Sequence, residues 1–355
     1  GIPQHLVELI KDMYRDPQFR VKDGGRCTNY RPQRSGIRQG CPLSPYLFDL
    51  LLTVVFHDIY AQFDQDTRLA IEQGKPHKAV STELFYADDT LLTANNADIM
   101  ETVLHAIQIE SAKYNMSLNE GKCILLRTNS ISPVTFISGQ AIPVENKAIY
   151  LGSLLNHNSN QKEEIKNRIS QTMQTLKKLD TFWNKARTSV KWKVRVYNAV
   201  INAKLLYGLE AVVISAADAA KLDAFQNKAL RKILKIKAAY WSRVSNAAVL
   251  VKANEALTTE RANVEVIPVS KTLENRQIRL LAHLLRAPQD DPMRQISLDL
   301  QGNRLKADFK RVGRPRLKWY DMVRDKAMKR LCQLQVIPHD WSNILTKDEQ
   351  TQLLR

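Results

Sequence analysis

Cysteine is scarce in this 355-residue chain, and its four copies, Cys27, Cys41, Cys123 and Cys332, never form a Cys-x-x-Cys pair. This scatter argues against a zinc ribbon and a disulfide scaffold, and it favours a reducing, intracellular compartment. No apolar run approaches the roughly 18 residues that a membrane-spanning helix needs, so we expect no membrane partner. Twelve glycines and thirteen prolines are too few for a collagen-like or low-complexity chain. Because the first residue is Gly1 and not Met, we expect a processed, trimmed or partial product.

Acidic residues are in deficit as well, and only in the second part of the chain. The formal net charge is +17 overall, −2 over residues 1–160 and +19 over residues 161–355. A positive region attached to a nearly neutral one is typical of proteins that bind a polyanion, so we expect a nucleic-acid partner. The alternative is a helical domain that carries many solvated lysines.

The spacing of apolar residues predicts strands and helices before residue 160 and helices almost alone after it. An apolar helix follows Ser44, an amphipathic helix covers 97–116, and residues 84–94 read as a buried apolar hairpin. Short strands are expected at 122–126 and 150–155. The later helices are expected at 165–179, 190–206, 215–233 and 273–285, with a last one that opens at Pro315. This pattern predicts an α+β fold.

Two adjacent carboxylates, Asp88 and Asp89, stand at the expected tip of the hairpin. An ionised carboxylate in an apolar setting is costly unless a cation compensates it. Two-metal nucleotidyl transfer supplies such a cation, because Mg²⁺ binds one or two protein carboxylates together with substrate phosphates. The alternative is a plain surface turn, since Asp is a common turn residue.

A second block, SGIRQGCPLSP at residues 35–45, precedes the long apolar helix. Its glycines allow close backbone approach to a ligand, and Arg38 and Gln39 can reach a phosphate or a base edge. With the FYADD segment at 85–89, Gly121-Lys122 and the Tyr150-Leu151-Gly152 turn, this block resembles the reverse transcriptases of non-LTR (LINE-type) retrotransposons. The four motifs occur in the order of that family.

The resemblance implies a role for each motif. Asp88 and Asp89 would bind Mg²⁺, and Lys122 would donate a proton to the leaving pyrophosphate, unless it is a simple turn lysine. The nucleotide and template would contact Arg38, Gln39, Gly40 and Pro42, although Arg38 could instead brace the loop by pairing with a carboxylate. The primer grip would comprise Tyr150, Leu151 and Gly152. Tyr86 is expected to pack in the core.

The family's first catalytic aspartate has no counterpart here. That aspartate lies on an earlier strand, and nothing between Gly1 and Ser35 resembles it. Paired Mg²⁺ ions need ligands from both strands. We therefore expect this chain alone to be inactive, although its ancestry is that of an RNA-directed DNA polymerase. An incomplete palm sheet also exposes a strand edge, which other proteins would cover.

A basic segment near the C-terminus is a second candidate for nucleic-acid binding. Residues 303–330 contain eleven Lys or Arg and three Asp. The functional interpretation is an extended arm whose cations reach phosphates, with Trp319 and Tyr320 stacking on bases. The alternative is a basic loop before a helix whose aromatics are core. The expected binding residues of the arm are Arg311, Arg314, Arg316 and Lys318. The other helical tryptophans are expected in the core: Trp183, Trp192 and Trp241.

We predict a partial reverse-transcriptase palm over 1–158, a helical thumb over 159–212, a helical connection over 213–287, and a basic arm with a C-terminal helix over 288–355. Two functions follow. The first is an inactive, RNA-binding scaffold subunit of a ribonucleoprotein particle such as a ribosome. The alternative is a retroelement polymerase whose fingers and first aspartate lie on an upstream segment. Its partner would be RNA or an RNA/DNA duplex. The polymerase would act in the nucleus or cytoplasm, and a ribosomal subunit could lie in the mitochondrion.

Overall fold

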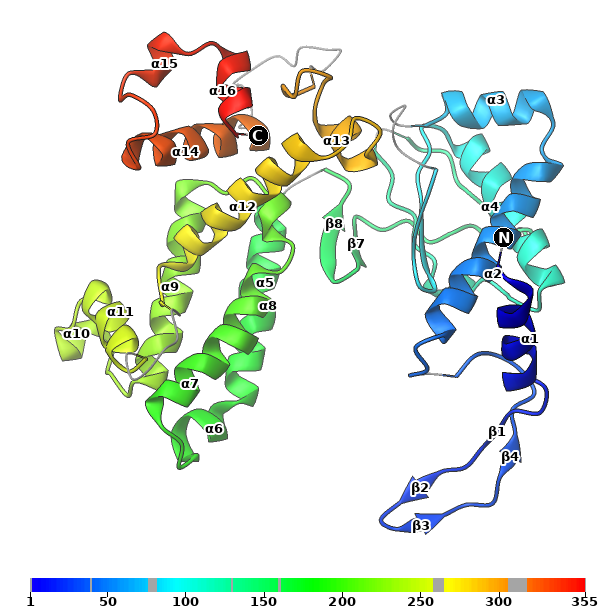
Figure 1. Ribbon diagram of the computed structural model, residues 1–355, viewed down its shortest axis with the longest axis horizontal. Helices are drawn as coiled ribbons and strands as arrows, with labels where there is room; N and C mark the ends of the chain where they lie inside the picture. Colours follow the sequence, from blue (N-terminus) through cyan, green and yellow to red (C-terminus); the bar gives the residue numbers. More distant parts are fainter. Residues whose placement is uncertain are drawn as a thin grey trace. The chain divides into compact units, whose positions relative to one another are not determined.

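The computed structural model describes residues 2–38, 40–75, 82–128, 130–158, 161–257, 265–305 and 318–354. The chain divides into two compact units (Figure 1). Unit 1 comprises residues up to 75, 82–119 and 135–140, and unit 2 comprises 120–134 and the residues from 141 onward. Each unit has a hydrophobic core of its own.

Unit 1 combines helices with small antiparallel hairpins. Its helices are α1 (Gln4–Met13), α2 (Ser44–Gln62), α3 (Gln65–Gln73) and α4 (Ala97–Lys113). Strand β1 (Gln18–Phe19) pairs with β4 (Arg31–Pro32), β2 (Lys22–Asp23) with β3 (Arg26–Cys27), and β5 (Glu83–Tyr86) with β6 (Asp89–Leu92).

The core of unit 1 lies between α2 and α4. Val55 and Ile59 of α2 are fully buried against Val103 and Ile107 of α4. Helix α4 begins at residue 97 because the Asn96 side chain accepts a hydrogen bond from the Ile99 amide at 2.8 Å, which satisfies one free N–H of the first turn. The core therefore fixes α2, which directly follows the loop at 35–45 and contacts strand β5 of the hairpin that contains residues 85–89.

Unit 2 is mainly helical. It starts with the 3₁₀-helix η1 (Glu120–Lys122) and one hairpin, β7 (Lys147–Tyr150) with β8 (Ser153–Asn156). Its helices are α5 (Gln161–Lys178), α6 (Asp180–Lys185), α7 (Val190–Val196), η2 (Tyr197–Asn202), α8 (Ala203–Leu206), η3 (Leu209–Ala211), α9 (Ala216–Ile233), α10 (Ala239–Ser242), α11 (Asn246–Glu255), α12 (Val269–Arg286), α13 (Pro292–Ser297), α14 (Trp319–Gln333), α15 (Trp341–Ile344) and α16 (Lys347–Leu354).

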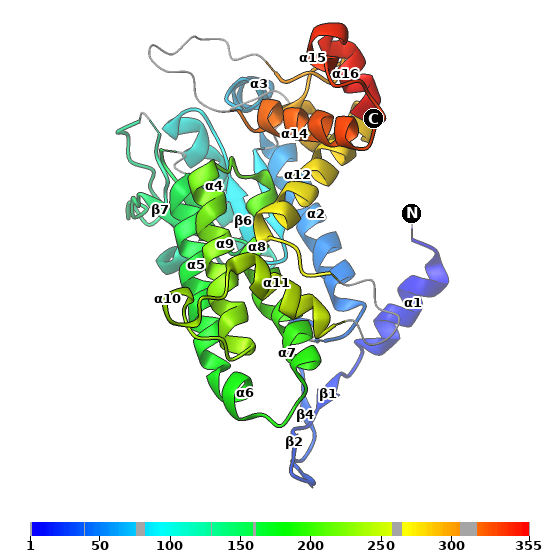
Figure 2. The ribbon, with the colours of Figure 1, turned by 90° about the vertical axis from the view of Figure 1, so that its left-hand side faces the viewer.

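Helices α5, α8 and α9 run side by side around the larger core (Figures 1 and 2). Trp183 and Tyr197 are fully buried there, and the Trp183 indole donates to the Leu176 carbonyl at 3.0 Å. Ser215 caps α9 by accepting from the Asp218 amide at 3.2 Å, as the Ser-x-x-Asp pattern predicts. Within the described part of the chain, no helix is both long and apolar enough to cross a bilayer.

Most expected helices are confirmed, and the fold is helix-rich with small sheets, which is compatible with α+β. Two expected strands are wrong in detail. Residues 120–122 form η1, and only Leu125 of the segment that follows makes a bridge, to Val144. Residues 150–155 are not one strand: Tyr150 ends β7, residues 151–152 form the hairpin turn, and residues 153–155 belong to β8. The last helix starts at Trp319, and Pro315 lies outside the described residues.

Two tryptophans were also assigned wrongly to the core. Trp183 is buried as expected, but Trp192 and Trp241 are 56% and 75% exposed. All three occur in helical patterns, and the pattern alone does not reveal which helix faces gain a partner.

Candidate functional site

The loop before α2 is open to solvent. Gly36 and Gly40 have φ of +74° and +83°, and a Cβ at either position would meet nothing within 4 Å. Both glycines are therefore required by the left-handed backbone and not by lack of space. Arg38 and Pro42 are exposed, and no carboxylate in the described ranges pairs with Arg38. Gln39 lies outside the described residues.

The aspartate pair lies at the tip of the β5–β6 hairpin. Tyr86 pairs with Asp89 and Phe85 with Thr90, so Ala87 and Asp88 form the two-residue turn. Ala87 has φ of +54°, a left-handed conformation that a residue with a Cβ adopts at a cost of roughly 1–2 kcal/mol. Asp88 therefore projects from a strained tip, and Asp89 follows as the first residue of β6.

Helix α2 connects this hairpin to the glycine-containing loop. The Phe85 ring contacts Phe56 with centroids 4.3 Å apart at 61°, and the Tyr60 hydroxyl donates to the Glu83 carboxylate. Since Glu83 meets Tyr60 and Phe85 meets Phe56, β5 runs antiparallel to α2. The tip with Asp88 therefore points toward the N-terminal end of α2, where the loop ends.

The hairpin is exposed, which corrects two predictions. Leu84, Phe85 and Tyr86 are 45%, 42% and 64% exposed, so the hairpin is not buried and Tyr86 is not a core residue. Leu92, near the base of the hairpin, packs against the α2–α4 core, whereas the residues of the tip are exposed. Solvated carboxylates pay little desolvation, so burial does not demand a cation here.

Asp88 and Asp89 nevertheless fit Mg²⁺ as part of a ligand set. Both are exposed and neither forms a salt bridge within the described residues. Mg²⁺ prefers carboxylate oxygens and commonly takes only one or two from protein, with water and phosphate completing the octahedron. No group of three or more potential ligand side chains occurs in the described part of the chain. The pair is thus suited to a metal that arrives with phosphates.

Lys122 and the Tyr150–Gly152 turn belong to unit 2. Lys122 is exposed at the end of η1. Leu151 and Gly152 have φ of +47° and +77°, the conformation of a two-residue hairpin turn with positive φ at both positions. The structure places these residues on elements other than those that carry the aspartate pair.

Residues of α5 and of the segment after α8 hold that turn. Arg168 is buried, and its guanidinium donates to the Gly152 carbonyl and, through Nε at 2.6 Å, to the Glu164 carboxylate. Glu164 also accepts from the Leu154 amide at 2.9 Å, and the Tyr207 hydroxyl donates to the Leu151 carbonyl at 2.9 Å. The sequence did not predict this network, because the bonds that tie α5 and Tyr207 to the β7–β8 hairpin join residues 10 to 56 positions apart.

The C-terminal aromatics are packed and not available for stacking. The Trp319 indole donates to the Glu210 carbonyl at 2.7 Å, and Tyr320 is buried. This supports the alternative in which the aromatics are core. Lys318 is exposed just before α14, whereas Arg311, Arg314 and Arg316 lie outside the described residues.

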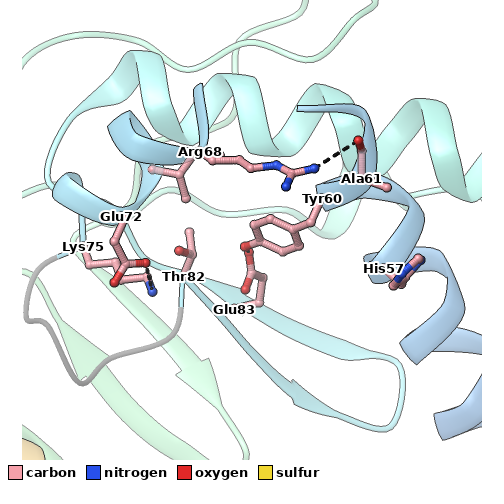
Figure 3. Close-up of a pocket in the computed structure, with 9 residues that line it drawn as sticks. His57, Tyr60, Ala61, Arg68, Glu72, Lys75, Thr82 and Glu83 are labelled. Carbon is pink, nitrogen blue, oxygen red and sulfur yellow. Dashed lines mark hydrogen bonds and ion pairs between the residues drawn. The ribbon is translucent and has the colours of Figure 1, made fainter. Parts of the chain in front are cut away.

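A cavity of about 580 Å³ lies beside the base of the hairpin (Figure 3). Tyr60 and Glu83 line it together with Arg68 and the Glu72–Lys75 ion pair, whose charged atoms are 2.5 Å apart. Burial, and then the nearby Glu83 carboxylate, raise the pKa of Tyr60, and burial raises the pKa of Glu83. No pattern in the sequence predicted this cavity.

Comparison with known proteins identifies the family. The model for reverse transcriptase (RNA-dependent DNA polymerase) matches residues 1–193. The chain belongs to the reverse transcriptase family. All four motifs lie inside the matched residues, and the basic C-terminal segment lies outside them.

The named relatives are polymerases of mobile elements, which confirms the resemblance to the non-LTR group. The chain is 25% identical over 241 residues to the RNA-directed DNA polymerase from mobile element jockey of Drosophila funebris, covering 64% of this chain and 25% of that protein. It is 26% identical over 246 residues to the Drosophila melanogaster counterpart, covering 65% and 25%. It is 25% identical over 253 residues to the retrovirus-related Pol polyprotein from type-1 retrotransposable element R2 of Popillia japonica, covering 66% and 38%. The chain thus spans about a quarter of the length of the jockey relatives.

Reverse transcriptases generally use Mg²⁺ and bind RNA and DNA templates. Two of these relatives are RNA-directed DNA polymerases and the third is a Pol polyprotein, and none of the three is a ribosomal component. The comparisons therefore favour the polymerase alternative over the scaffold function.

Proposed function

We propose that this chain is part of the RNA-directed DNA polymerase of a non-LTR retroelement. In this proposal residues 1–158 contribute to the palm, 159–212 form the thumb, and the regions 213–287 and 288–355 extend it. The observation that carries the proposal is the connection made by α2. The helix begins at the SGIRQGCPLSP loop, and its second half anchors the hairpin that points Asp88 back toward that loop.

Asp88 and Asp89 would hold Mg²⁺ in the polymerase. The bound ion would neutralise the charge that develops on the phosphate oxygens. The chain's own part is to aim two solvated carboxylates at one point, on a hairpin clamped by Phe56 and Tyr60. Gly36 and Gly40 let the neighbouring backbone approach a nucleotide closely, and Arg38 presents an unpaired cation.

The roles of Lys122 and of Tyr150–Gly152 rest on the resemblance. Lys122 would donate the proton that the leaving pyrophosphate takes up, and the Tyr150–Gly152 turn would position the primer end. The +19 charge of residues 161–355 supports binding of a template–primer duplex by the thumb and the regions after it. No segment within residues 1–35 resembles the strand that carries the first catalytic aspartate in the family. That aspartate would therefore come from outside residues 1–35.

The experiment is a primer-extension assay on the tagged native product that contains these residues, with an RNA template, a DNA primer and Mg²⁺. We expect the wild type to extend the primer and the double variant Asp88→Asn/Asp89→Asn to lose at least about 100-fold in rate. The matched control is Asp66→Asn, which removes one exposed carboxylate from α3 in the same unit.

Two results would overturn the proposal. One is a double variant that extends primers as well as Asp66→Asn does. The other is a native protein that does not extend primers and that co-purifies with ribosomal RNA and ribosomal proteins. That outcome is expected of the scaffold function. The 355-residue chain alone should bind template–primer in a salt-dependent manner without extending it.

A further inference from the structure

Two adjacent aromatic side chains of unit 2 face solvent. Tyr240 and Trp241 of α10 are 71% and 75% exposed, and their rings contact each other edge to face with centroids 4.9 Å apart. Large exposed aromatic pairs are uncommon on a soluble surface and mark interaction sites. We call residues 235–243 the aromatic knob.

The aromatic knob is held rigidly although it is exposed. Arg231 of α9 is buried, and its guanidinium donates to the Lys237 and Val244 carbonyls at 3.2 and 2.7 Å. It also donates to the Ser242 hydroxyl at 3.4 Å and to the Asn246 side chain at 3.0 Å. One arginine thus bonds both ends of the aromatic knob. Because the knob is already ordered, a ligand that binds it costs less conformational entropy of the protein.

The surroundings of the aromatic knob are basic. Residues 224–254 contain seven Lys or Arg and no Asp or Glu. Lys235 and Lys237 are exposed, and the Arg243 guanidinium lies 5.7 Å from the Tyr240 ring centroid. An apolar protein partner would not require this charge, whereas a polyanion with free aromatic faces matches both the rings and the cations.

We propose that the aromatic knob binds unpaired nucleotides of single-stranded RNA. Bases stack on Trp241 and Tyr240, and Lys235, Lys237 and Arg243 contact the phosphates. A duplex cannot satisfy the site, because its base faces are already stacked on one another. The site lies outside the residues that match the family model, and it needs neither a metal nor polymerisation.

The test is the affinity of the full chain for a fluorescein-labelled uridine homopolymer, measured by anisotropy in EDTA. We expect Tyr240→Ala/Trp241→Ala to weaken binding by roughly 5- to 150-fold with an unchanged salt slope, because stacking carries no charge. Lys235→Ala/Lys237→Ala should instead reduce the salt slope by roughly 1.4. Tyr240→Phe/Trp241→Phe should retain most of the affinity, since the ring faces remain.

The matched control is Val251→Ala, which shortens an exposed apolar side chain on the neighbouring α11 and should leave the affinity unchanged. A hairpin RNA duplex should bind equally well to wild type and Tyr240→Ala/Trp241→Ala. The proposal is overturned if the alanine pair binds the homopolymer within about twofold of wild type. It is also overturned if the alanine pair loses as much affinity for the hairpin duplex as for the homopolymer. A third contrary result is an alanine pair that binds the homopolymer normally and loses only binding to anionic vesicles or self-association. Because EDTA removes Mg²⁺, none of these outcomes bears on the polymerase activity.

Discussion

The guanidinium of Arg168 lies 4.9 Å from the centroid of the Tyr207 ring, and both side chains bond the same hairpin turn. Arg168 donates to the Gly152 carbonyl, and Tyr207 donates to the Leu151 carbonyl. The turn that the resemblance identifies as the primer grip is therefore fixed by α5, the first helix after it, and by the end of α8. Any change in this network should register in the stability of unit 2.

The first prediction concerns Arg168. Arg168→Ala leaves Glu164 buried without its cation, so we expect a loss of about 3–5 kcal/mol in unfolding free energy. Urea unfolding followed by tryptophan fluorescence measures this loss in unit 2, because all five tryptophans occur there. The control Lys166→Ala, an exposed residue of the same helix, should change stability by no more than about 0.5 kcal/mol. An Arg168→Ala variant as stable as Lys166→Ala would refute the structural role.

The second prediction concerns Gly208. Its φ is +73°, and a Cβ there would lie 2.8 Å from the Ser153 hydroxyl. Gly208→Ala should therefore add a steric clash to the backbone strain and destabilise unit 2 by more than about 1 kcal/mol. Gly152→Ala is the matched comparison, because its φ is +77° but its nearest neighbour, Tyr207 Cε1, is 3.6 Å away. Equal losses in urea unfolding for the two variants would show that the clash is absent.

The third prediction is a pH dependence that comes from Glu83. Burial raises the pKa of Glu83, so the folded protein binds more protons than the unfolded one across the interval above the ordinary value of about 4.3. The contribution to stability is therefore full below that value, and it is lost as the pH rises through the raised pKa. Hydrogen exchange of the β5 and β6 amides should show this loss in the wild type.

The Glu83→Gln variant isolates the effect. Several other carboxyls of unit 1 have lowered pKa values and act in the opposite direction: Asp58, Asp64 and Glu101. Subtracting the Glu83→Gln profile from that of the wild type removes their contribution. Glu72→Gln, which takes a carboxylate from the exposed rim of the same cavity, is the control. A difference profile that is flat, or that rises with pH, would contradict the assignment.

Local sequence signals predicted the elements well and their exposure poorly. The Ser215 cap and the apolar stripe of α2 are short-range features, so α9 and α2 start where they were expected. Trp183 and Trp241 have similar sequence surroundings, yet one is buried and the other is not, because burial depends on which neighbouring helix covers a face.

In the candidate site, too, the local features were predicted from the sequence and the long-range contacts were not. The aspartate hairpin was located from its residues, but its solvent exposure was not, because the apolar strand residues do not indicate what covers them. The hydrogen bonds that hold the Tyr150–Gly152 turn were not predicted, because their partners are far apart in the sequence. Arg168 bonds Gly152 from 16 residues away, and Tyr207 bonds Leu151 from 56 residues away. No pattern within one helix or strand contains such a relationship.

The last prediction concerns the thiol in the glycine-containing loop. A hydrogen bond from the Leu43 backbone amide lowers the pKa of Cys41 most, and hydrogen bonds from Ser44 and then the positive charge of Arg38 lower it further, whereas burial raises the pKa of Cys123. The thiolate is the reactive form, so at any pH below full ionisation Cys41 should react faster. Iodoacetamide labelling followed by peptide mass spectrometry from about pH 6 to about pH 9 should show the labelling rate of Cys41 rising at a lower pH than that of Cys123.

Arg38→Ala should shift the rise in the Cys41 labelling rate to higher pH, because a cation that favours the thiolate is removed. Arg34→Ala removes another exposed cation of the same segment and is the matched control. Addition of template–primer and nucleotide should slow the labelling of Cys41 if the loop contacts the nascent base pair, and leave that of Cys123 unchanged. A Cys123 that reacts first would contradict both pKa directions, and a Cys41 that stays equally reactive with template–primer bound would argue against the proposed place of the loop in the polymerase.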